Sequence, residues 1–141
     1  MRLELTRKTD LAVKTLCALD GKDRMKGSVL ADSIGSTPGF LAQVIMPLVD
    51  RGWVASVPGP TGGYQLAAGL SDITVLQVIE AIEGPTFNGR CVLDSGPCPH
   101  SEICALHEPW QRARSALVAE LSAATVASVA DLADRRPAAT A

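Results

Sequence analysis

The pattern between residues 28 and 67 is the feature that most limits what this chain can fold into. A cluster of apolar residues predicts a short helix over 28–34, and Gly35 ends it. Another helix opens at the Ser-Thr-Pro sequence of residues 36–38, where a hydroxyl group can cap free backbone amides and proline takes the first helical position. Strand, glycine-rich turn and strand follow over 53–67. This order predicts a winged helix-turn-helix.

The helix that opens at residue 36 is the candidate for reading DNA. In a helix-turn-helix, the second helix presents its N-terminal residues to the major groove. The residues expected to face outward are Thr37, Gly39, Phe40 and Gln43, and a glutamine can pair with adenine through two hydrogen bonds. Pro47 lies inside this helix and removes one backbone hydrogen bond, so we expect a kink or loosening near Gln43. Many small helical domains share this outline without binding DNA.

The hairpin that follows strengthens the DNA-binding interpretation. Glycines at the tip of a wing, here Gly62 and Gly63, allow the backbone to approach phosphate groups closely. The side chains of Thr61 and Tyr64 add hydroxyl donors for the same purpose. A hairpin that only packs on the helices remains the alternative interpretation.

The composition is that of a small globular protein. With 141 residues and a 47% hydrophobic content, the chain is long enough for one compact domain with a buried core. No apolar run approaches the length that spans a bilayer, and the first residues lack the apolar block of a secretion signal. We therefore expect a cytoplasmic protein without a membrane segment, in which cysteines are reduced thiols.

The charge is distributed unevenly along the chain. Residues 1–65 hold eight Lys and Arg against six Asp and Glu, whereas residues 66–141 hold five against nine. The N-terminal half is therefore the better candidate surface for a polyanion. The excess is too small to predict nucleic-acid binding by itself.

Three of the four cysteines, Cys91, Cys98 and Cys104, lie close together and are separated by six and five residues. Glycine and proline interrupt this stretch, so we expect a loop. Thiolates in a reducing compartment suit an iron–sulfur cluster or a structural zinc, and the residues alone leave these two about equal. Cys17 lies in a first amphipathic helix over 9–19 and is expected to be part of the core.

Two further helices flank the cysteine loop. Thr74 and Gln77 form a capping-box pattern that starts a helix running to about Glu83. After the loop, a long helix carries one apolar stripe, and a stripe of that length predicts a symmetric dimer, with packing inside one chain as the alternative. The stripe of the long helix consists of Leu106, Trp110, Ala113, Leu117, Leu121 and Ala124. Thr125 is expected to cap a short last helix.

Several of these segments together resemble the Rrf-two family of bacterial transcription regulators. The resemblance rests on residues 52–66, on residues 73–85, on the three-cysteine loop and on residues 125–132. It implies a mostly α-helical winged helix-turn-helix protein with a small β-hairpin wing. It also implies a homodimeric repressor that binds a double-stranded DNA operator under the control of an iron–sulfur cluster, with a 4Fe-4S cluster favoured over a 2Fe-2S cluster. Whether the regulator also activates transcription is left open by the sequence.

The resemblance also supplies two candidates for the fourth ligand beside the three cysteines. His107 follows Cys104 in a Cys-x-x-His arrangement like that of the IscR members, which suits sensing of cluster occupancy or redox state. Asp10 resembles the aspartate of the NsrR members, which reaches across the dimer, and this resemblance slightly favours nitric oxide as the signal. Without a metal, His107 merely starts a helix and Asp10 merely caps one.

Two departures from the family concern its contacts with DNA. Many members carry an arginine before the first glycine of the wing, and this chain has Pro58 instead. Its recognition helix is also nearly uncharged. Phosphate contacts are therefore expected from Arg7, Lys8 and Lys26, with a strong dependence on salt.

The sequence predicts four segments. These are a DNA-binding domain over 1–84, a cluster-binding loop over 85–104, a segment with the dimerisation helix and the terminal helix over 105–134, and a tail over 135–141. The alternatives are a winged-helix regulator with structural zinc or no metal, and an electron carrier or enzyme. An enzyme is not expected, because the chain shows no nucleophile paired with a base and has only two histidines.

Overall fold

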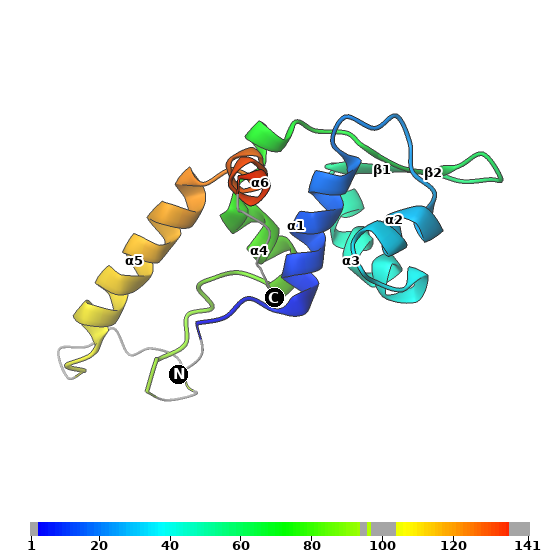
Figure 1. Ribbon diagram of the computed structural model, residues 1–141. Coiled ribbons are helices and arrows are strands. Elements are labelled where there is room, and N and C mark those ends of the chain that lie inside the picture. The colour runs from blue at the N-terminus through cyan, green and yellow to red at the C-terminus, as the bar shows by residue number, and fades with distance from the viewer. Residues whose placement is uncertain (1–2, 94–95, 97–103, 136–141) are drawn as a thin grey trace, which may run out of the picture.

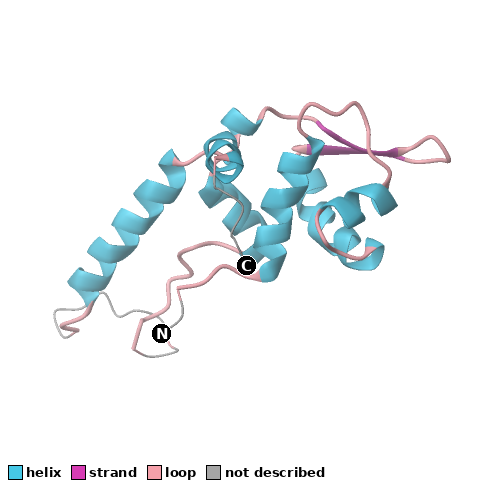
Figure 2. Cartoon of the chain, viewed as in Figure 1, coloured by secondary structure: helices cyan, strands magenta, loops and turns pink. Residues whose placement is uncertain are grey.

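The computed structural model describes residues 3–93, 96 and 104–135. A winged-helix body occupies the centre, the β-hairpin projects from one end, and one long helix stands at the other end (Figure 1). Helices dominate and the two strands form one antiparallel sheet (Figure 2). The elements are α1 (Arg7–Leu19), α2 (Gly27–Ser33), α3 (Pro38–Asp50), β1 (Val54–Val57), β2 (Gly63–Leu66), the 3-10 turn η1 (Leu70–Asp72), α4 (Val75–Glu83), α5 (His107–Ala123) and α6 (Val126–Asp134).

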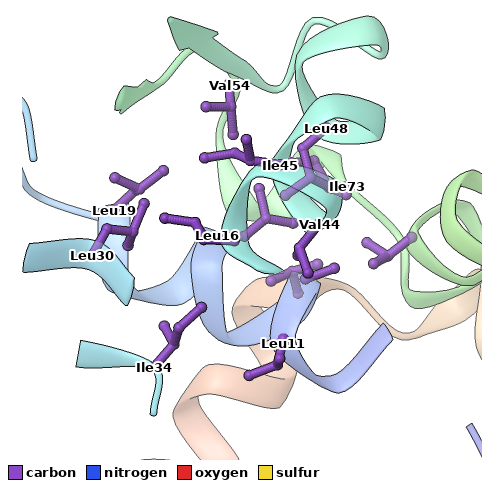
Figure 3. Packing of buried hydrophobic residues seen from close by; sticks show 14 of the residues in the cluster. Leu11, Leu16, Leu19, Leu30, Ile34, Val44, Ile45, Leu48, Val54 and Ile73 are labelled. Carbon is purple, nitrogen blue, oxygen red and sulfur yellow. The ribbon is translucent and has the colours of Figure 1, made fainter. Parts of the chain in front are cut away.

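One hydrophobic core joins the first three helices to the sheet. Leucine and isoleucine side chains of α1, α2 and α3 meet at its centre, and Val54 of β1 and Ile73 close it from the sheet side (Figure 3). Among its largest members, Leu11, Leu16 and Leu48 are at most 2% exposed. Cys17 packs half-buried against this core, and burial raises the pKa of its thiol, as expected for an apolar site.

Threonine hydroxyls cap the starts of α1 and α3, whereas α2 has no side-chain cap. The first helix begins at Arg7, two residues earlier than predicted, because the Thr6 hydroxyl accepts a hydrogen bond from the Thr9 amide at 3.3 Å. The third helix starts at Pro38 as predicted, with the Thr37 hydroxyl accepting from the Phe40 amide at 3.2 Å. It continues through Pro47 to Asp50, so the proline does not break the helix.

A third chain segment extends the two-stranded wing. The register of the sheet pairs Val54 with Leu66 and Val57 with Gly63. Met25, in the loop between α1 and α2, pairs with Tyr64 through two backbone hydrogen bonds of 2.9 and 2.8 Å. The loop before α2 therefore holds β2 in place, which ties the wing to the helix-turn-helix.

The last helix returns to the winged-helix body. Thr125 caps α6 with a capping box completed by Ser128, and Thr74 caps α4 in the same way with Gln77, both as predicted. Thr74 and Thr125 form a β-bridge, and Val126 is fully buried in the core. By its packing, α6 therefore lies with the body rather than with α5.

Helix α5 lies at the end of the molecule opposite the β-hairpin and contacts α4 of the body (Figure 1). Within the described residues none of its side chains is buried, and Leu117 is 46% exposed. Pro109 lies in its first turn, where proline is tolerated. A groove along α5 is lined by Leu3, Thr86, Trp110, Ala113, Arg114, Ala116, Leu117 and Glu120.

Across the described residues, no single helix has the length and apolar character needed to cross a membrane. Helices α2 and α3 reach that length and composition only as a pair, and the pair is bent by 96°.

Candidate DNA interface and cysteine pocket

The N-terminal end of α3 gathers three of the predicted DNA-binding residues. Arg7 extends from α1, and its guanidinium Nη2 donates to the Gly35 carbonyl at 3.4 Å. A shallow hollow at this point is lined by Arg7, Thr37 and Phe40 together with residues of the turn between α2 and α3. A cation and the N-terminus of α3 thus lie on one surface, an arrangement suited to a phosphate group.

The remaining predicted contacts of the helical region are less closely grouped. Gln43 is exposed on α3, one turn after Phe40. Lys8 is half-buried on α1. Met46 was not singled out by the sequence pattern, yet 64% of it is exposed three residues after Gln43. Periodicity alone does not reveal an outward-facing methionine in so apolar a helix.

Three of the four predicted wing residues lie at a second hollow, which Thr61 does not line. Lys26, Gly62, Gly63 and Tyr64 all line it. A side chain at Gly62 would place its Cβ 2.0 Å from the Val57 carbonyl oxygen. A Cβ at Gly63, whose φ is +146°, would lie 2.3 Å from the Met25 carbonyl oxygen. Both glycines are therefore required by the packing of the wing itself, apart from any approach to DNA.

One polar contact at the tip of the wing was missed by the sequence analysis. The guanidinium Nη1 of Arg24 donates to the Thr61 carbonyl oxygen at 3.0 Å. The two residues are 37 positions apart, and no motif links them. Only the pairing of Met25 with β2 brings Arg24 to the wing.

Two of the three clustered cysteines and the predicted histidine line one pocket. We call it the cysteine pocket; its lining residues are Phe87, Arg90, Cys91, Val92, Cys104, His107, Trp110, Gln111 and Arg114. His107 is the first residue of α5, and its amide donates to the Cys104 carbonyl at 3.1 Å. Cys98 lies outside the described residues. Among the residues that the structure does describe, no three ligating side chains are close enough together to hold a metal ion.

Two arginines give the cysteine pocket a positive rim. Arg90 and Arg114 both line it. The guanidinium of Arg114 lies over the Phe87 ring, 4.7 Å from its centroid, and its Nη1 donates to the Gln111 side chain at 3.2 Å. The Arg114 side chain is therefore held in place by two contacts. Its charge complements thiolate ligands, which are the form of cysteine that binds metals.

Asp10, the other candidate ligand, lies elsewhere. It sits in the first turn of α1, and its carboxylate pairs with Lys14 at 2.7 Å, with about half of each side chain exposed. It is not among the residues that line the cysteine pocket. The suggestion that Asp10 caps the first helix is wrong, because Thr6 is the capping residue.

A cluster of hydrogen bonds connects the start of α1 to the end of α4. Glu83 Oε1 accepts from the Thr6 amide at 2.9 Å, from the Thr6 hydroxyl at 2.9 Å and from the Thr9 hydroxyl at 2.5 Å. Gly84 follows immediately and begins the segment that leads to the cysteine pocket. The carboxylate thus fixes the starting point of that segment against the first helix of the DNA-binding body.

Comparisons with known proteins agree with this architecture. The profile of the Rrf2 family, described as an iron-dependent transcriptional regulator, matches residues 5–132. Protein aau3 of Rhizobium meliloti is 30% identical over 139 residues, which cover 96% of this chain and 88% of that protein.

Solved structures share the fold. The global cysteine regulator CymR of B. subtilis superposes with a TM-score of 0.73 at 24% identity and covers 93% of this chain and 98% of its own. IscR of T. potens superposes with a TM-score of 0.70 at 24% identity and covers 99% of this chain and 93% of its own. The chain has the winged-helix fold of these proteins and belongs to the Rrf2 family of DNA-binding transcriptional regulators.

Proposed function

We propose that this Rrf2-family regulator is a cytoplasmic homodimer, a repressor whose affinity for an operator in double-stranded DNA is controlled by an iron–sulfur cluster held at the cysteine pocket. The observation that carries the proposal is the convergence of Cys91, Cys104 and His107 on one pocket where α5 begins. The proposed activity is regulatory binding and not catalysis, in keeping with a family of transcription regulators.

The residues present suit such a cluster. Two thiols and an imidazole line the pocket, and Cys98 belongs to the short stretch of chain between the two cysteines. Cluster irons take thiolate ligands, and histidine replaces cysteine in some of them. When bound, the group would supply iron–ligand bonds that oxidants or nitric oxide break. We favour a 4Fe-4S cluster, as the family resemblance does, with 2Fe-2S as the second choice.

We favour His107 over Asp10 as the fourth ligand within one protomer. His107 lines the pocket together with two of the cysteines, whereas Asp10 is engaged by Lys14 on α1. Asp10 could serve only by reaching the pocket of a partner protomer. A histidine ligand suits sensing of cluster occupancy or redox state, because protonation of the imidazole nitrogen would release it from the iron. Nitric oxide then becomes the second candidate signal.

A series of contacts can carry a signal from the cysteine pocket to DNA. Residues 84–106, which we call the sensor segment, follow directly after Glu83. Glu83 in turn holds Thr6 and Thr9 at the start of α1. Arg7, which follows Thr6 in the chain, donates to the Gly35 carbonyl in the turn before α3. A displacement of the sensor segment would therefore change how α1 and the recognition helix sit relative to each other.

On this proposal, the predicted DNA contacts divide by role. Thr37, Phe40 and Gln43 face base edges from α3, and Met46 lies beside them. The wing and the basic side chains position the protein on the phosphate backbone. The backbone contacts come from Arg7, Lys8, Lys26, Thr61, Gly62, Gly63 and Tyr64.

The dimer is proposed to form along α5. Trp110, Ala113 and Leu117 line an apolar groove, and within the described residues no α5 side chain is buried. A helix with one apolar face gains stability when a second copy covers that face.

Anaerobic purification followed by visible absorption spectroscopy and metal analysis tests the cluster. We expect a coloured protein with iron and sulfide, and we expect Cys98→Ala and Cys104→Ser to lose the colour. His107→Ala should change the spectrum more than Asp10→Ala. A colourless protein with stoichiometric zinc, or a normal spectrum in Cys98→Ala, would overturn the proposed ligands and favour a regulator with structural zinc or no metal.

A further inference from the structure

The wing has no positive side chain of its own. Between Val54 and Leu66 the sequence contains no lysine or arginine. Basic side chains supply many of the protein contacts to DNA phosphates. A wing that lies against the DNA backbone therefore needs a cation from another part of the chain.

The loop between α1 and α2 brings two cations to the wing. Met25 pairs with Tyr64 of β2, and its side chain packs against the hydrophobic core. Neighbouring residues of an extended segment point to the opposite side, which directs Arg24 and Lys26 away from the core. Both are exposed.

Arg24 reaches the tip of the hairpin. The tip is a tight turn in which the Gly62 amide donates to the Gly59 carbonyl at 2.9 Å. Within this turn, the carbonyl of Thr61 accepts from Arg24 Nη1 at 3.0 Å. The bond holds the tip of the wing and fixes the guanidinium beside it.

The rest of the guanidinium remains available for a ligand. An arginine carries five N–H donors, and the bond to Thr61 uses one of them. In the part of the chain that the structure describes, the ion pairs join Lys14 to Asp10 and Arg112 to Glu108, and neither involves Arg24. An exposed, positioned guanidinium with unused donors is well suited to a phosphate oxygen.

We propose that Arg24 is the cation of the wing: it holds the Thr61 carbonyl and donates its other N–H groups to a DNA phosphate. The role rests on the DNA binding of the regulator and is independent of any cluster. It adds to the predicted phosphate contacts a residue that belongs to neither the recognition helix nor the hairpin.

The test is a fluorescence-anisotropy titration over a range of KCl concentrations. The probes are a duplex selected from a random library by the wild-type protein and a shuffled duplex of the same composition. We expect Arg24→Gln to weaken binding about tenfold on both duplexes. The slope of log Kd against log salt should become shallower by about 0.9 for each wing that contacts DNA. Arg24→Lys should recover most of the slope.

Lys22→Gln is the matched control, because it removes the same charge from an exposed position of the same loop. An unchanged slope in Arg24→Gln, or an equal change in Lys22→Gln, would overturn the role of Arg24. A loss confined to the selected duplex would also overturn it, since that result indicates base reading. Equal melting temperatures of the wild type and the variants exclude a folding defect. If the wild type itself fails to bind DNA, the proposed function is wrong, and this result is distinct from a failure of the role of Arg24.

Discussion

At the scale of single residues, one carboxylate links the beginning of the DNA-binding body to the end of α4. Burial alone would raise the pKa of Glu83, but the hydrogen bonds from Thr9 and Thr6 outweigh it and lower the pKa below the ordinary value of 4.5. The carboxylate also lies at the N-terminus of α1, where negative charge is favourable.

Replacing Glu83 by Gln should reduce stability in a manner that depends on pH. A carboxyl group whose pKa is lowered by folding stabilises the folded state above its unfolded pKa, and the effect is lost as pH falls through its folded pKa. We expect the wild type to be more stable than Glu83→Gln by about 1 kcal/mol at pH 7, a modest value because the site is partly solvated.

Urea denaturation at a series of pH values measures this difference. It should be constant down to about the ordinary pKa of 4.5 and should shrink below it. Glu4→Gln serves as the control, because it removes an exposed carboxylate from the N-terminal segment that Glu83 contacts at Thr6. A difference between wild type and Glu83→Gln that does not change with pH would contradict the assignment.

The residues that could be predicted from the sequence are those whose partners are close along the chain. Thr37, Thr74 and Thr125 cap helices through bonds to residues three positions away, and all three were predicted. The partners of Glu83 lie 74 and 77 positions away, and Thr61 lies 37 positions from Arg24. Such contacts depend on the tertiary packing and leave no local pattern.

At the scale of elements, periodicity and turn chemistry predicted most of the fold. The hairpin and α3 lie where the glycine-rich turn and the Thr-Pro start indicate. The placement of α6 against the body was not predictable, because the burial of Val126 and the bridge between Thr74 and Thr125 involve residues far apart in sequence. The boundaries of the four predicted segments, with α6 grouped beside α5, stay a prediction.

Helix α5 offers a direct test of the proposed dimer. Leu117→Glu would place a charge in the centre of the apolar groove, and an unpaired charge buried in an interface should weaken association by about 3 kcal/mol or more. Analytical ultracentrifugation should then detect monomers at concentrations where the wild type is dimeric.

Ser115→Glu is the matched control for this substitution. Ser115 is exposed on the same helix, two residues away and on the opposite face from Leu117. If both variants dissociate alike, or neither does, the α5 groove is not the dimer interface.

At the scale of the whole molecule, the cysteine pocket lies between two functional parts. The residue before the sensor segment is bonded to α1 of the DNA-binding body, and the residue after Leu106 begins the proposed dimer helix. Sequence spacing identified the cysteines but did not decide between Asp10 and His107, because that choice depends on where α1 and α5 lie in space. The geometry within one chain groups His107 with the cysteines.

Control of DNA affinity by an iron–sulfur cluster at this pocket can be measured directly. It is tested most directly by comparing anaerobically reconstituted protein with apoprotein on the selected duplex, at one salt concentration, by fluorescence anisotropy. We predict that the two forms differ in Kd about tenfold or more, a coupling in the usual allosteric range. We also predict that Cys104→Ser behaves as apoprotein under both conditions. Equal Kd values for the reconstituted protein and the apoprotein would show that the cluster does not control DNA affinity.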